Sequence, residues 1–164
     1  MPKSNITKVW AVNEIVAAAD LNQVAENANP QRDYTLYSNV ASGFSVSATT
    51  TFVTLYTQAH TPRTSRVKVT VNLTVANATG AVATYDYTLH HGSTAAVVNN
   101  ASGSATNGFA QDSVANNQSS HITFVVIVTG LTPGVLWYFG PGSRRSVAGT
   151  ACTSPRNILL IEDF

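Results

Sequence analysis

The residues whose side chains could do chemistry are few in this sequence, and they lie far apart. Four histidines are present, of which His90 and His91 are adjacent, while His60 and His121 stand elsewhere. Neighbouring residues on a strand point to opposite faces, so His90 and His91 are poorly placed to bind one metal ion. Only across an oligomer axis could one histidine from each copy meet. We therefore expect no metal site and no cofactor.

Carboxylates that could form an acid/base pair are equally sparse. Asp86 and Asp112 are the only acidic residues between Asp33 and Glu162. A glycosidase-type site would have to be built from these two isolated side chains. The sequence contains no nucleophile elbow, phosphate-binding loop or metalloprotease motif. Together these observations predict a protein that is not an enzyme.

The single cysteine, Cys152, excludes an intrachain disulfide. No histidine lies near it in the sequence, so we interpret it as a buried apolar residue and not as a reactive thiol.

An aromatic run, Trp137, Tyr138 and Phe139, is followed by Arg144 and Arg145. The run could present a platform for a sugar, and the arginines could bind an acidic group. In the interpretation that we favour, alternate aromatic residues enter the core while the other packs against a neighbouring subunit. Paired arginines in a turn-like stretch most often lie in water or in the polar rim of an interface.

The composition points towards assembly. Only 10% of the residues are charged and the formal net charge is +1, against about 25% charged residues in typical soluble proteins. A nucleic-acid partner is not supported by this balance. The longest apolar run, Ile122 to Val128, is too short to span a membrane. Neutral faces lose water at modest cost, so we expect a homotrimer with Tyr85/Tyr87 or Trp137/Phe139 at its seam.

From Gly43 onward the hydrophobic period is two. The stretch "RVKVTVNLTVA" places its apolar residues on one face and its polar residues on the other, as in a half-buried antiparallel strand. About eight such strands, separated by turns such as Gly140-Pro141-Gly142, predict a mainly β protein. We assign residues 43–164 to a jelly-roll-like antiparallel β-sandwich, in which Asn99 to Ser120 forms a long loop or a weak hairpin.

The stretch before this domain has a different pattern. Leu21, Val24, Ala25 and Ala28 follow helical spacing, and Pro30 ends the helix, which we place at about 17–29. Such a helix is marginal alone in water, so its apolar stripe must dock on another surface. Residues 1–42 are therefore predicted to form an N-terminal arm.

The segment "WAVNEIVAAADLN" resembles a pattern found near the N-terminus of many tailed-bacteriophage virion proteins, roughly W-x-x-[GN]-E-x-[LV]-[TA]-A-A-D-L-N. Ala17 departs from it, where a helix-capping Thr is common. The later stretches "YDYTL", "VTGLTPG" and "NILLIEDF" also resemble the small β-sandwich domains of such proteins. The residues that match the pattern are Trp10, Glu14, Ala18, Ala19, Asp20, Leu21 and Asn22.

The resemblance implies a virion structural protein whose N-terminal arm fastens it to the particle. The residues expected to attach it are Trp10, Val12, Glu14, Ile15, Asp20, Leu21 and Val24. The expected function is that of a capsid decoration or cement protein, which binds itself and the major capsid protein or another virion protein. Its expected location is the virion, after synthesis in the host bacterial cytoplasm.

An alternative is a tail-associated receptor-binding protein that recognises a host surface glycan. In that case residues 137–139 and the 99–120 loop would lie together at one exposed tip, with Arg144 nearby.

Overall fold

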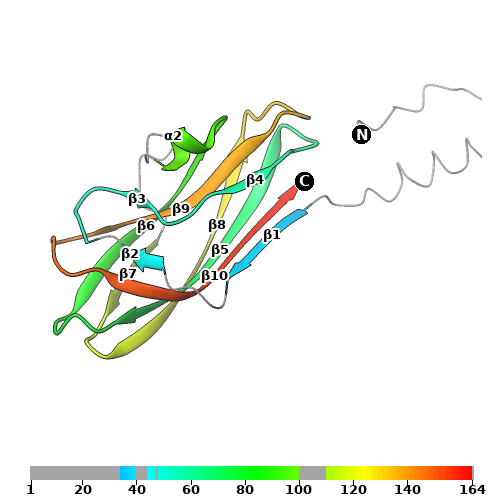
Figure 1. Cartoon of the computed structure of the whole chain (residues 1–164). Helices are drawn as coiled ribbons and strands as arrows, with labels where there is room; N and C mark the ends of the chain where they lie inside the picture. The colour runs from blue at the N-terminus through cyan, green and yellow to red at the C-terminus, as the bar shows by residue number, and fades with distance from the viewer. Residues whose placement is uncertain (1–33, 40–43, 47, 100–109, 164) are drawn as a thin grey trace, which may run out of the picture.

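Ten strands and one short helix form the part of the chain that the computed structural model describes, namely residues 34–39, 44–46, 48–99 and 110–163 (Figure 1). The elements in chain order are β1 (Tyr34–Asn39), β2 (Phe44–Val46), β3 (Val53–Thr54), β4 (Gln58–His60), β5 (Arg66–Asn77), β6 (Ala83–Gly92), α2 (Ala95–Asn99), β7 (Ala110–Val114), β8 (Gln118–Thr129), β9 (Trp137–Arg145) and β10 (Cys152–Asp163).

These strands form two antiparallel sheets. The first sheet has the order β1-β10-β5-β8, with β2 also paired to β10, and the second has the order β3-β9-β6-β7, with β4 also paired to β9. Since β1 and β2 follow one another along β10, and β3 and β4 along β9, the ten strands fill eight positions. Numbered along the chain, these positions lie in the orders 1-8-3-6 and 2-7-4-5, which is the double-sheet jelly roll predicted from the sequence.

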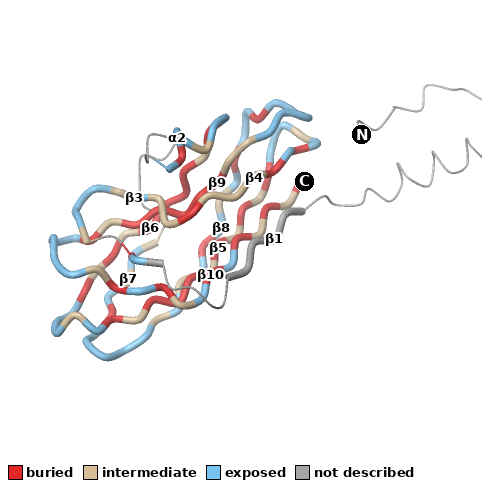
Figure 2. Tube along the Cα trace, in the orientation of Figure 1, coloured by how far each residue is buried: buried red, intermediate tan, exposed pale blue. Residues whose placement is uncertain are grey.

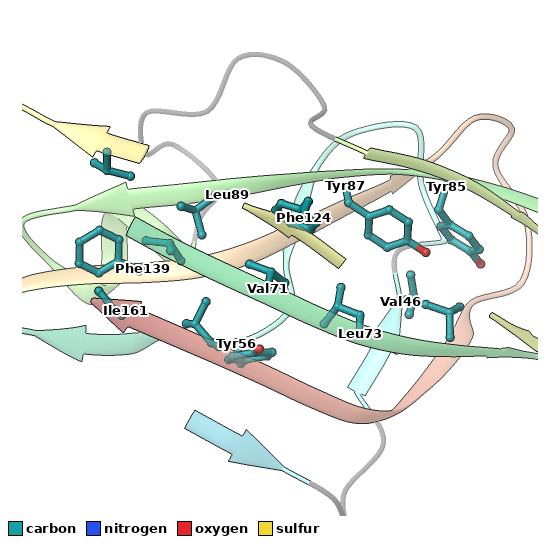
Figure 3. Packing of buried hydrophobic residues seen from close by; sticks show 14 of the residues in the cluster. Val46, Tyr56, Val71, Leu73, Tyr85, Tyr87, Leu89, Phe124, Phe139 and Ile161 are labelled. Atoms are coloured by element: carbon teal, nitrogen blue, oxygen red, sulfur yellow. The ribbon is translucent and has the colours of Figure 1, made fainter. Parts of the chain in front are cut away.

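The core lies between the two sheets, as the alternation in β5 predicts. Its inward residues Val67, Val69, Val71, Leu73 and Val75 are all fully buried. Buried and less buried residues alternate along the strands (Figure 2). The second sheet contributes large aromatic and aliphatic side chains that pack against them (Figure 3), among them Tyr85, Tyr87, Leu89 and Phe139.

The structure places some segments differently from the sequence analysis. Residues 34–39, which we had assigned to the arm, form β1 and pair with β10 from Tyr34↔Glu162 to Asn39↔Asn157. The turn expected at residues 140–142 is absent, because β9 continues through these residues as an inner strand of the second sheet.

For residues 99–120 we expected a long loop or a weak hairpin, and among the described residues β7 and β8 do not form a hairpin with each other. Strand β7 pairs with β6, while β8 pairs with β5 in the other sheet, so the chain crosses between the sheets at residues 115–117. Residues 100–109 lie outside the described part of the chain, as do the expected helix at 17–29 and all the attachment residues that precede Tyr34.

In the described residues, no helix is long and apolar enough to cross a bilayer.

Candidate functional site

The outward face of the second sheet carries a charged cluster centred on Asp86. Register brings Asp86 on β6 opposite Arg144 on β9 and Gln111 on β7. Arg144 Nε donates to Asp86 Oδ2 at 2.8 Å, and Gln111 Nε2 donates to Oδ1 at 2.7 Å. The hydrogen bond from Arg144 holds the pKa of Asp86 below its usual range. The guanidinium also lies 4.6 Å from the centroid of the Phe52 ring, within the range of a cation–π interaction.

Arg144 is therefore positioned by two neighbours, Asp86 and Phe52. Its side chain is 43% exposed, so one side of the guanidinium remains accessible. The sequence predicts Arg144 as a candidate but not its partners, because Phe52 is distant in sequence and Asp86 is brought opposite Arg144 only by strand register. Arg145, the next residue, points inward and donates from Nη1 to the Thr150 carbonyl at 2.6 Å.

The aromatic run does not form a common surface. Phe139 is fully buried in the core and Trp137 packs against that core, whereas Tyr138 lies between them and points to the opposite face. Two of the three rings are therefore committed to packing. This agrees with the interpretation that alternate residues enter the core, and it removes Phe139 from the residues that could line a subunit seam or a glycan platform.

Tyr85 and Tyr87 were expected on an exposed face, and this expectation is wrong. Both side chains are fully buried between the sheets, with ring centroids 6.2 Å apart. The Cys152 backbone N–H donates to Tyr85 Oη at 3.3 Å, and burial raises the pKa of Tyr85 to about 12. The physical reason is strand alternation. The polar residues Thr84 and Asp86 of β6 face outward, so Tyr85 and Tyr87, which alternate with them, face the core.

The two adjacent histidines have separate packing roles. His90 points outward but is covered, since its Nδ1 lies 2.8 Å from Thr54 Oγ1 and its ring meets Phe52 edge-on. His91 points inward and stacks on Phe139 at a centroid distance of 6.2 Å. Burial lowers the pKa of His90, with a further lowering from His91, and burial alone lowers the pKa of His91.

These lowered pKa values predict a stability that falls in mild acid. Below the unfolded-state histidine pKa of about 6.5, the unfolded chain takes up protons that folded His90 and His91 resist. The free energy of unfolding should decrease between about pH 6.5 and 5, by at most about 1.4 kcal/mol per pH unit for each histidine. Asp86 has no part in this window, because its lowered pKa affects stability only below about pH 4.

Thermal melts of the full chain from pH 8 to 5 measure this effect. The His91→Gln variant should show a shallower dependence of Tm on pH than the wild type. A Tm that stays constant from pH 7 to 5 would contradict the prediction.

The carboxylates Asp86 and Asp112 do not form an acid/base pair. Asp86 lies on the outward face, while Asp112 is paired in register with the inward residue Tyr85. Among the described residues there is also no group of three or more His, Cys, Asp or Glu side chains that could hold a metal ion.

A buried polar pair joins the two sheets at one end of the sandwich. His60 Nε2 on β4 lies 3.1 Å from Asp163 Oδ1 on β10, and the Arg63 backbone N–H donates to Asp163 Oδ2 at 3.0 Å. This pair was not predicted from the sequence, since nothing in the local pattern links residues so far apart in the chain. Both side chains are almost fully buried, so this arrangement serves to tie β4 to β10.

One exposed feature was also missed, on strand β8. Val125 and Ile127 are 53% and 57% exposed, although their neighbours Phe124 and Val128 are buried. The run "ITFVVIV" is apolar throughout, so its sequence does not indicate which of its residues face solvent.

Comparison with known proteins gives a likeness of fold only. No family model and no curated protein matches this sequence. A solved structure of the infectious bursal disease virus VP2 subviral particle aligns with 82% of this chain and 33% of its own, at 11% identity and a TM-score of 0.48. The T13 viral particle of the same virus aligns with 99% of this chain and 39% of its own, at 13% identity and a TM-score of 0.48. The chain thus spans little more than a third of the structures that it is similar to.

Proposed function

We propose that this protein is a non-enzymatic structural protein of a tailed-bacteriophage particle, and that it decorates the assembled capsid. The observation that carries the proposal is the resemblance of residues 10–22 to the N-terminal segment of phage virion proteins, in front of a jelly roll. The described residues give further support, because His60, His90 and Asp86 are engaged in packing and strand-to-strand contacts.

In this proposal the N-terminal segment attaches the protein to the particle. The segment enters the sandwich at Tyr34, the first residue of edge strand β1, opposite Glu162 near the end of β10. A segment that joins an edge strand at its end can contact a neighbouring protein without disturbing the core. Decoration then stabilises the shell by burying surface across capsid subunits, since a ligand that binds only the assembled state favours that state.

The first test is removal of the segment. Because β1 belongs to the sheet, the deletion should stop before Tyr34. We expect a chain lacking residues 1–33 to keep its β-sheet circular dichroism and to lose binding to purified particles in a sedimentation assay. Particle binding retained by the folded truncated chain would refute attachment through this segment.

Point variants of the full chain sharpen the test. Leu21→Asp together with Val24→Asp places charge on the predicted apolar stripe and should weaken particle binding at least tenfold. The matched control is Val147→Asp, whose site is 71% exposed on the sandwich, and which should bind like the wild type. Equal binding by both variants would contradict the role of the stripe.

The location of the protein on the particle separates decoration from the receptor-binding alternative. Gold labelling of intact particles should give density over the shell. Density confined to the tail would favour the receptor-binding protein. The burial of Phe139 and the packing of the partly buried Trp137 against the core remove much of the aromatic platform on which a glycan would stack.

A further inference from the structure

Three of the four sheet edges in the described residues are formed by short strands. At one edge of the first sheet lie β1 and β2, with six and three residues; in the second sheet, β3 and β4 have two and three residues, and β7 has five. Short edge strands limit pairing with other chains, because they present few free backbone groups in a row.

The fourth edge, strand β8, is different. It runs without interruption over twelve residues, Gln118–Thr129, and within the described residues it pairs only with β5. It contains no Asp, Glu, Lys, Arg, Pro or Gly. Charged residues, proline and bulges are the usual means of blocking an edge. Strand β8 has no such residue, and no other strand among the described residues pairs with its outer side.

The side chains of β8 that point outward from the sandwich are also uncharged. Val125 and Ile127 are both more than half exposed, next to Thr123. The nearest charge on the adjoining strand belongs to Lys68, which is opposite Ile127 in register, and this charge is neutralised by Glu162 at 2.5 Å. His121, the one titratable residue of β8, has its Nδ1 2.9 Å from Thr74 Oγ1.

We propose that β8 pairs antiparallel with β8 of a second copy of this chain, about a two-fold axis. The pairing joins the two first sheets into one continuous sheet. A two-fold contact uses the same surface on both copies, so it needs no second complementary site. In the register whose two-fold axis passes by Val125, Thr123 and Ile127 lie opposite each other and Val125 lies opposite its own copy, and no like charges are opposed. A second copy fits better than a charged partner strand, because β8 has no charged residue to pair with one.

Pairing through β8 also limits the assembly to a dimer. Once both β8 edges are paired, the remaining edges are the short strands of the first and second sheets. Growth into an open-ended sheet is therefore disfavoured. The inference stands on the edge strand alone and does not depend on the proposed role in a virion.

The mass of the purified full-length protein tests the proposal. Light scattering after gel filtration at micromolar concentration should give a dimer, and the Val125→Lys/Ile127→Lys double variant should have half that mass. Lysine at these exposed positions blocks edge pairing and disturbs the folded monomer little. The control Val147→Lys, on an exposed surface away from β8, should keep the wild-type mass. Unchanged circular dichroism spectra show that the variants remain folded.

Cysteine crosslinking gives a second and more specific readout. Cys152 is buried, so single cysteines at Thr123, Val125 or Ile127 supply the reactive thiols. About a two-fold axis, disulfide-linked dimers should form most at the position nearest the axis and less on either side. The control Val147→Cys should form few.

Several results would overturn the pairing. A monomeric mass for the wild-type protein would overturn it, whether β8 is then free or is covered by residues 1–33 of the same chain. So would a wild-type trimer, a mass unaffected by the two lysines, or crosslinking no greater than at position 147. Loss of particle binding by the lysine variant without any change in mass would assign the edge to another virion protein and not to a second copy.

Discussion

Replacement of Gly140 by alanine is expected to destabilise the fold severely, by about 3 kcal/mol or more. A Cβ at this position would overlap the Tyr56 carbonyl oxygen and lie 2.6 Å from Thr54 Cγ2. The Tyr56 oxygen belongs to the backbone, and the adjacent Leu55 N–H donates to the Pro141 carbonyl at 2.8 Å. The segment cannot move away without losing its pairing with β9. Urea denaturation followed by circular dichroism measures the effect.

Gly142 provides a matched comparison two residues further along the same strand. A Cβ there would lie 2.6 Å from Cε1 of the His90 ring. Because this neighbour is a side chain, a second substitution can remove the overlap. The cost of Gly142→Ala should therefore decrease when His90 is also replaced by alanine, whereas the cost of Gly140→Ala should not. A Gly140→Ala variant as stable as the wild type would show that the segment carrying Tyr56 is not held against β9 as the structure has it.

These two glycines also explain why a turn was wrongly predicted at residues 140–142. Gly and Pro most often mark turns, and local sequence offers no other interpretation of Gly-Pro-Gly. In the structure the glycines allow the close approach of segments 54–56 and 90 from elsewhere in the chain. Such contacts depend on tertiary packing, so they are invisible to a local pattern.

The parts of the fold that could be predicted are those in which local alternation decides the structure. The five apolar residues of β5 share a face because the strand period is two, and all five are buried. From several such strands without long helices between them, the jelly roll follows as the simplest sandwich. The pairing of β1 with β10 was missed, because it joins opposite ends of the chain and "YTLYSN" has little alternation of its own.

The candidate surfaces were harder to predict than the fold. Alternation places Tyr85 and Tyr87 on one face of β6, but which face meets the core depends on the distant strands that pack on it. The same limit applies to β8, where register with β5 decides that Val125 faces solvent and Phe124 the core. Composition alone pointed towards self-association. It did not locate the surface, since an uncharged edge is recognised only when the order of the strands is known.

Phe139 offers the second large effect, because its role distinguishes a core residue from a surface one. The ring is fully buried, stacks on His91, and lies 6.5 Å from the His60 ring. Phe139→Ala removes this packing and leaves a cavity between the sheets, which should cost about 3–5 kcal/mol of the free energy of unfolding. The neighbouring Tyr138 is only partly buried and points the other way, so Tyr138→Ala should cost about 1 kcal/mol.

The comparison of these two variants by urea denaturation decides between the two roles. If Phe139 instead lined a seam between copies, Phe139→Ala would change the mass of the assembly and leave the stability of the folded monomer nearly intact. We expect the opposite result. Substitution of Val125 and Ile127 should change the mass of the assembly, because these residues are exposed on β8. Substitution of Phe139 should lower the stability of the fold, because its ring lies between the sheets.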